Sequence, residues 1–116
     1  MATAKTTAVT INVTITGATA SAPSAVAHLN DEVTWVVDGE VAADDEVSVG
    51  GFRRSDGTPA SPMAKADHLR KRTGKGAIGD SVRANAGADT YKYDIAIRRS
   101  SAGGASLFDP EIQIKP

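Results

Sequence analysis

The feature that most constrains this chain is a two-residue alternation of large apolar and polar side chains. It is clearest at residues 91–97, where two tyrosines and two isoleucines are separated by Lys92, Asp94 and Ala96. This alternation is typical of a β-strand with one buried and one exposed side. We predict further strands at residues 9–15, 33–37 and 111–115 and, from weaker patterns, at 24–29, 46–52 and 81–85.

Length and turn residues narrow the fold class. The chain has 116 residues, with 20 alanines and 27 larger apolar residues, which suffices for one two-layer domain. Gly17, Asp38-Gly39 and Asp109-Pro110 separate the strands, and short strands between such turns favour a sandwich or barrel. We therefore predict an all-β, antiparallel Greek-key β-sandwich over residues 7–116, preceded by a flexible N-terminus at 1–6.

One segment departs from the strand pattern. Ser61 followed by Pro62 is typical of a helix start, and Gly74 follows a basic stretch as a helix terminator would. Apolar residues recur at every third position between them. The sequence therefore predicts one short helix at 62–72, inserted in a long connection.

Charge is nearly balanced overall but uneven along the chain. The net charge of −1 excludes a uniformly basic nucleic-acid binder. Residues 31–46 contain seven acidic side chains and no basic one, whereas residues 53–83 contain eight basic side chains and three acidic ones. We expect the two segments to form two oppositely charged surfaces.

The predicted partner-binding residues come from the basic segment. A helix C-terminus attracts cations through its dipole, but this segment has more cations than the dipole needs. They suit an anionic protein surface or, as a second possibility, phosphates of nucleic acid. Against nucleic acid, the segment has no aromatic residue for base stacking. The predicted binding residues are Lys65, Arg70, Lys71, Arg72 and Lys75.

The acidic segment offers a second interaction surface. Its order of residues does not match the calcium-binding loop that can be recognised from sequence, so a solvated loop or a docking surface for a basic partner is expected. The predicted acidic partner surface comprises Asp38, Glu40, Asp44, Asp45 and Glu46.

Two stretches resemble the cupredoxin-like β-sandwich family. The first is residues 29–37, Leu-Asn-Asp-Glu-Val-Thr-Trp-Val-Val, and the second is residues 88–95, Ala-Asp-Thr-Tyr-Lys-Tyr-Asp-Ile. With the closing strand at 111–115, the resemblance covers roughly residues 7–115 and implies a cupredoxin-like fold. An immunoglobulin-like sandwich, which uses a similar aspartate-to-tyrosine approach to a strand, is the alternative.

The resemblance implies a blue-copper site whose ligands this chain lacks. Such a site needs one cysteine, two histidines and usually a methionine. The cysteine would fall at about Asp94 or Ile95, the first histidine in the loop after Val37, and the other ligands in residues 96–110; none is present. We therefore exclude blue-copper electron transfer and expect a protein without metal or other cofactor.

Other catalytic and cofactor patterns are equally weak. His28 and His68 lie far apart in sequence and form no ligand pair, with or without Met63. Residues 74–79 spell G-x-G-x-x-G, but they follow a polar run instead of a buried strand, so we interpret them as a mobile loop. No nucleophile-elbow motif occurs. We therefore expect no enzymatic activity.

Two functions remain. The first is a non-catalytic binding module that uses its end loops and the basic 62–75 segment to contact a protein partner. The second is a structural, self-assembling protein whose terminal strands pair at an exposed edge and whose charged segments complement each other between copies. A membrane partner is not expected, since no run of 18 apolar residues exists. Because no apolar signal segment opens the chain, a cytoplasmic location is slightly favoured over a processed secreted form.

Overall fold

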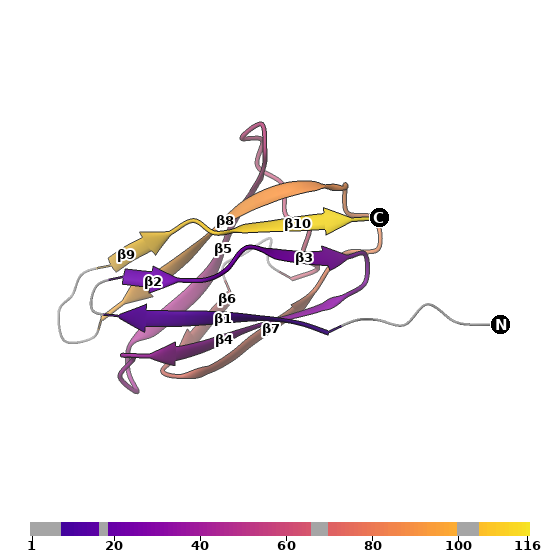
Figure 1. Cartoon of the computed structure of the whole chain (residues 1–116). Helices are drawn as coiled ribbons and strands as arrows, with labels where there is room; N and C mark the ends of the chain where they lie inside the picture. The colour runs from indigo at the N-terminus through magenta and orange to yellow at the C-terminus, as the bar shows by residue number, and fades with distance from the viewer. Residues whose placement is uncertain (1–7, 17–18, 66–69, 100–104) are drawn as a thin grey trace.

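The computed structural model describes residues 8–16, 19–65, 70–99 and 105–116. Every regular element in these ranges is a β-strand, which confirms the all-β prediction (Figure 1). The strands are β1 (Ala8–Thr16), β2 (Thr19–Ser21), β3 (Ala25–His28), β4 (Glu32–Gly39), β5 (Glu46–Arg54), β6 (Arg70–Thr73), β7 (Gly76–Ser81), β8 (Asp89–Arg98), β9 (Ala105–Phe108) and β10 (Glu111–Lys115).

The strands form two mixed sheets. The four-stranded sheet has the order β2-β1-β4-β7, and the six-stranded sheet has the order β3-β10-β8-β5-β6 with β9 also paired to β8. The pairs β1–β4 and β3–β10 are parallel, so the prediction of purely antiparallel sheets is wrong at two places. The β1–β4 pair is parallel because of the connection between the two strands. After β2 the chain crosses to β3 in the six-stranded sheet, and it then returns to the four-stranded sheet in the direction of β1.

The two sheets face each other across one core, in a sandwich-like arrangement. Trp35 on β4 and Tyr93 on β8 come from opposite sheets, and both are fully buried. The Trp35 indole N–H donates to the Tyr93 hydroxyl over 3.0 Å, and the Phe52 ring stacks on Tyr93 with centroids 5.0 Å apart. The predicted inward side of each regular strand is therefore the buried side, because large apolar side chains gain most from leaving water.

Apart from β9, which pairs with β8 alone, the strands at the sheet edges lie in pairs that are close in sequence. β2 and β3 follow each other and end the two sheets on one side, whereas β6 and β7 do so on the other. β10 is bonded on both sides, whereas β1 is bonded to β4 from Ala8 to Ile15 but to β2 only from Thr14 to Thr16. β10 therefore does not provide the exposed edge that the self-assembly hypothesis placed at the terminal strands, whereas residues 8–13 of β1 pair on one side only within the described part of the chain.

The predicted helix at 62–72 is wrong. Met63 is fully buried and bridges to Val82, and residues 70–73 form strand β6 on β5, with Val49 opposite Arg70. Burial of Met63 and pairing with β5 override the local helix signal, as tertiary contacts often do for weak propensities. Residues 66–69 lie outside the described residues. Within the described ranges no helix is long and apolar enough to cross a membrane.

The glycine-rich segment is also misassigned by sequence. Gly76–Ser81 forms β7, paired antiparallel to β4 with Ile78 opposite Trp35, so it is a strand and not a loop. The strand predicted at 81–85 therefore begins five residues after the start of β7 at Gly76. The sequence signal was obscured because the small residues Ala77, Gly79 and Ser81 occupy the outward positions of β7.

Tyr93 should make stability fall in alkaline solution. Burial raises the pKa of Tyr93 from its ordinary value of 10.0 to about 12, against a smaller lowering by the Trp35 hydrogen bond. The unfolded chain therefore loses this proton first, and the stabilisation is complete below pH 10 and is lost as the pH rises to 12. We expect a loss of about 2–3 kcal/mol over that interval in urea unfolding.

Tyr93→Phe is the control for this prediction, because it removes the titrating hydroxyl and keeps the ring. The difference in unfolding free energy between wild type and this variant should shrink between pH 10 and pH 12. A difference that stays constant over this interval would contradict the assignment.

Candidate functional site

The predicted basic residues form a band instead of one cluster. Lys65 lies against the end of β7, residues 70–72 lie in the edge strand β6, and Lys75 lies in the turn between β6 and β7. Lys65 and Lys75 are therefore near opposite ends of β7, a strand roughly 17 Å long. We call Lys65, Arg70, Lys71, Arg72 and Lys75 the basic band; it follows the β6–β7 side of the molecule.

Asp80 fixes one end of the basic band. Its carboxylate accepts hydrogen bonds from the Lys65 backbone N–H at 3.0 and 3.2 Å and from the Ser81 N–H at 2.8 Å. The Ala64 N–H adds a bond to the Ser81 carbonyl at 2.8 Å. Asp80 is buried on the inward side of β7, so its carboxylate serves the backbone and positions Lys65.

The acidic loop between β4 and β5 is folded onto its own chain. Asp45 is only 2 % exposed, and its carboxylate accepts from Arg99 at 2.8 Å and from the Ala42 N–H at 2.9 Å. Arg99 also donates to the Glu40 carbonyl, and the Gly74 N–H donates to the Asp45 carbonyl at 2.8 Å. Asp45 is therefore not part of an exposed acidic surface, which corrects that prediction.

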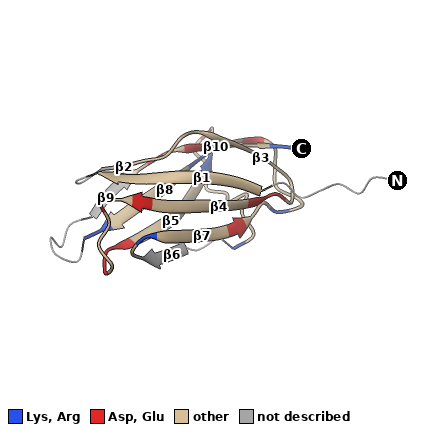
Figure 2. Ribbon diagram, turned by 60° about the horizontal axis from the view of Figure 1, so that its bottom comes forward, with Lys and Arg blue, Asp and Glu red and all other residues tan. Residues whose placement is uncertain are grey.

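Asp38 meets the basic band directly. Its carboxylate accepts from the Gly39 N–H at 2.8 Å and lies 3.5 Å from the Lys75 ammonium. The Gly39 hydrogen bond first, and then Lys75, lower the pKa of Asp38. This pair is exposed and contributes little to stability. In Figure 2 the charged residues gather at the strand ends, where the acidic loop meets the turn before β7.

The other predicted acidic residues are accessible to different degrees. Glu40 and Asp44 are exposed in the loop, and Glu46 is half-buried at the start of β5. The structure thus brings the acidic and basic segments together within one molecule. Charge complementarity between copies loses much of its basis, since Asp38 and Asp45 already have partners in their own chain.

The end of the molecule where the resemblance places copper ligands is closed by an ion pair. Asp45 comes from the loop after Val37 and Arg99 from the residues after Ile95, the two places where ligands were expected. Among the described residues, no three His, Cys, Asp or Glu side chains are grouped to hold a metal ion. His28 is exposed at the edge strand β3, and His68 lies outside the described residues.

A second polar cluster, which sequence reasoning missed, holds the start of β8. The Asp89 carboxylate accepts from Arg54 at 3.0 Å and from the Ser55 hydroxyl at 2.9 Å. These bonds, Arg54 first, lower the pKa of Asp89. The Tyr91 hydroxyl donates to the Gly87 carbonyl at 2.8 Å. Because all these groups are engaged with each other, the cluster is structural.

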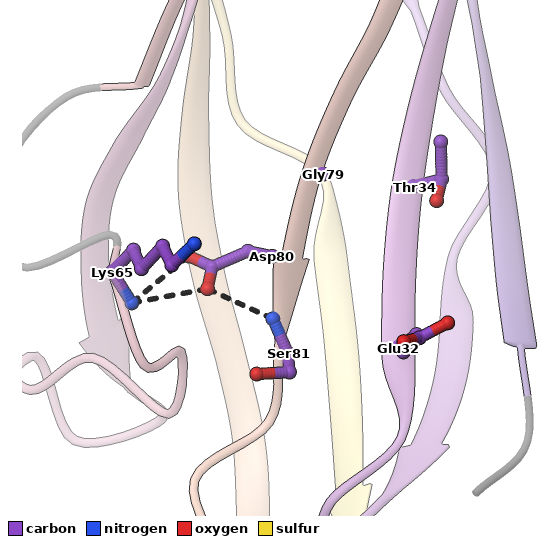
Figure 3. Close-up of a pocket in the computed structure, with 6 residues that line it drawn as sticks. All are labelled: Glu32, Thr34, Lys65, Gly79, Asp80 and Ser81. Carbon is purple, nitrogen blue, oxygen red and sulfur yellow. Dashed lines mark hydrogen bonds between the residues drawn. The ribbon is translucent and has the colours of Figure 1, made fainter.

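A polar pocket of about 310 Å³ lies next to Lys65, between outward residues of β4 and β7 and the inward Asp80 at the edge strand β7 (Figure 3). Among the residues that line the pocket, only Lys65 is a binding residue predicted from the sequence. The others are brought together by the β4–β7 register, which sequence alone did not provide. The pocket is lined by Glu32, Thr34, Lys65, Gly79, Asp80 and Ser81.

Comparison of the chain with protein-family models gives no match, and comparison with curated proteins gives none either.

The Arg99–Asp45 pair should contribute strongly to stability. Arg99→Met leaves the buried carboxylate without its main partner, which costs roughly 3 kcal/mol of unfolding free energy in urea titrations. Arg98→Met changes the neighbouring, exposed arginine of β8 and should stay within about 0.5 kcal/mol of wild type. Equal losses in the two variants would show that the ion pair has no special role.

Proposed function

We propose that this protein is a non-catalytic binding module that contacts an acidic protein surface through the basic band. The observation that carries the proposal is the position of β6. This strand ends the six-stranded sheet, and three of its four residues are basic: Arg70, Lys71 and Arg72. Charged residues on a short edge strand oppose further strand pairing. They therefore favour an electrostatic contact over extension of the sheet.

Self-assembly is the weaker alternative. It required two exposed terminal strands, but β10 is paired on both sides. It also required an acidic surface complementary to the basic band, but Asp45 is buried against Arg99 and Asp38 faces Lys75 of the same chain. A partner of a different kind, with its own acidic surface, fits the arrangement better.

Nucleic acid is disfavoured by the positions of the aromatic side chains. Single-stranded nucleic acids bind through stacking on exposed aromatic rings as well as through charge. Trp35, Phe52, Tyr91 and Tyr93 are all buried in the core, and Phe108 is half-buried on β9. The basic band offers charge without a stacking platform, which suits carboxylates on a protein surface.

The proposal includes a cupredoxin-like Greek-key fold that functions without a metal. Two observations support this fold type: the parallel β1–β4 and β3–β10 pairs, and a chain that changes sheet repeatedly between successive strands. The immunoglobulin fold has two antiparallel sheets. The hydrogen bond from Tyr91 to Gly87 resembles the tyrosine corner of immunoglobulin domains, so the Tyr91 segment does not separate the two fold types.

Neutralising β6 should weaken binding to an acidic polypeptide. We expect the triple variant Arg70→Gln, Lys71→Gln, Arg72→Gln to bind a fluorescent poly-glutamate peptide about tenfold more weakly in anisotropy titrations at low salt. The matched control is Lys92→Gln, Arg98→Gln, Lys115→Gln, which removes the same charge from exposed positions on β8 and β10. An equal loss in both variants, or tighter binding of a single-stranded oligonucleotide than of the peptide, would contradict the proposal.

Solution mass separates the binding module from the self-assembling alternative. We expect light scattering to give the mass of one 11.9 kDa chain at both low and high salt. The physical reason is that Asp38 and Asp45 of the acidic segment already pair with Lys75 and Arg99 of their own chain. A large species that dissociates as salt is raised would overturn this expectation and make the charged segments an interface between copies.

A further inference from the structure

The pocket on the four-stranded sheet exists because a glycine occupies an outward strand position. Gly79 lies opposite Thr34 in the β4–β7 register, and Ser81 lies opposite Glu32. A Cβ added at Gly79 would meet no heavy atom within 4 Å. The space that a side chain would fill in an ordinary strand is therefore open, and it forms the centre of the pocket.

The groups around Gly79 can both donate and accept hydrogen bonds. Figure 3 shows Lys65 and Asp80 on one side of Gly79, and Thr34 and Glu32 on the other. The Asp80 carboxylate is engaged by the Lys65 and Ser81 backbone N–H groups. This leaves the exposed Glu32 carboxylate, the two hydroxyls and the Lys65 ammonium as the groups that a ligand would meet.

The surrounding sheet face is polar and largely uncharged. Along β1 the outward positions are exposed Thr10, Asn12, Thr14 and Thr16. Thr10 is the register partner of Thr34, so a row of hydrogen-bonding groups runs from the pocket across β4 to β1. The middle of this face carries little charge in Figure 2.

We propose that this pocket binds a carbohydrate, with one sugar ring over Gly79. Neighbouring hydroxyls of a sugar both donate and accept, so they can donate to the Glu32 carboxylate and accept from the Lys65 ammonium, while the hydroxyls of Thr34 and Ser81 serve either way. The volume of about 310 Å³ is at the lower end for small-molecule sites and suits a monosaccharide unit. Longer glycans would continue along the Thr34–Thr10 row.

Charged ligands fit the pocket less well. A calcium ion needs six to eight oxygen ligands, but Asp80 is already engaged, so Glu32 is the one carboxylate left in the pocket. A phosphate would face two carboxylates with Lys65 as the single cation among the lining residues. A neutral ligand with many hydroxyls avoids both problems.

The test is a titration of ¹⁵N-labelled protein followed by two-dimensional NMR, with D-glucose, D-galactose, D-mannose, cellotriose and maltotriose as probes. Without an aromatic platform in the pocket, we expect a Kd on the order of 1–10 mM for at least one probe. The amides of Thr34 and Ser81 should show saturable shifts. Absence of saturable shifts with all five probes would overturn the proposal.

Two variants and one matched control test whether the sugar binds in this pocket. Gly79→Val places its Cβ in open space and suits a strand, so it should fold normally and abolish the shifts. Ala77→Val is the matched control, since it adds a valine to the same side of the same strand outside the pocket and should bind like wild type. Glu32→Gln should weaken binding about tenfold. Binding that survives Gly79→Val would overturn the site.

This site shares Lys65 with the basic band, but its other lining residues lie outside the proposed protein-binding surface. The pocket lies at β4 and β7, whereas Arg70, Lys71 and Arg72 are in β6 of the other sheet. The triple glutamine variant of β6 should therefore keep full sugar binding, and Gly79→Val should keep full poly-glutamate binding. Each proposal can fail while the other stands.

Discussion

The hydrogen bond between the Trp35 indole and the Tyr93 hydroxyl joins the two sheets inside the core, and the rest of the structure depends on this contact. Both residues are fully buried, so each polar group needs the other as its partner. Phe52 packs against both rings and closes the aromatic cluster. Because β4 and β8 are thereby held face to face, their loops and edges have fixed positions on the two ends and sides of the molecule.

Charge pairing within the chain then decides which surfaces are available to partners. The Arg99–Asp45 pair and the Gly74 hydrogen bond close one end of the sandwich-like fold, at the place where the resemblance to cupredoxin-like proteins leads one to expect metal ligands. Asp45 and Asp38 of the acidic segment pair with Arg99 and Lys75 of the same chain. The basic residues Arg70, Lys71 and Arg72 are in β6, the strand that ends the six-stranded sheet on the β6–β7 side of the molecule.

The fold also separates two kinds of surface. The edge at β6 is charged and narrow, which suits electrostatic contact with a macromolecule. The outward side of the four-stranded sheet carries hydroxyl groups at Thr10 and Thr34, with the Glu32 carboxylate beside them, and a Cβ at Gly79 would meet open space. Such a face suits a neutral ligand that forms many hydrogen bonds, and Lys65 is the residue that the two surfaces share.

The sequence by itself determined the all-β class and the inward side of the regular strands, because the alternation at 9–15, 33–37 and 91–97 reflects burial of every second residue. The tertiary structure alone decided the rest. The helix predicted from the local pattern around Met63 does not form, because Met63 is buried in the core and residues 70–73 pair with β5. The ion pair between Asp45 and Arg99 and the position of Gly79 between Lys65 and Thr34 join residues that are far apart in sequence. Such contacts are set by sheet register, which local patterns do not encode.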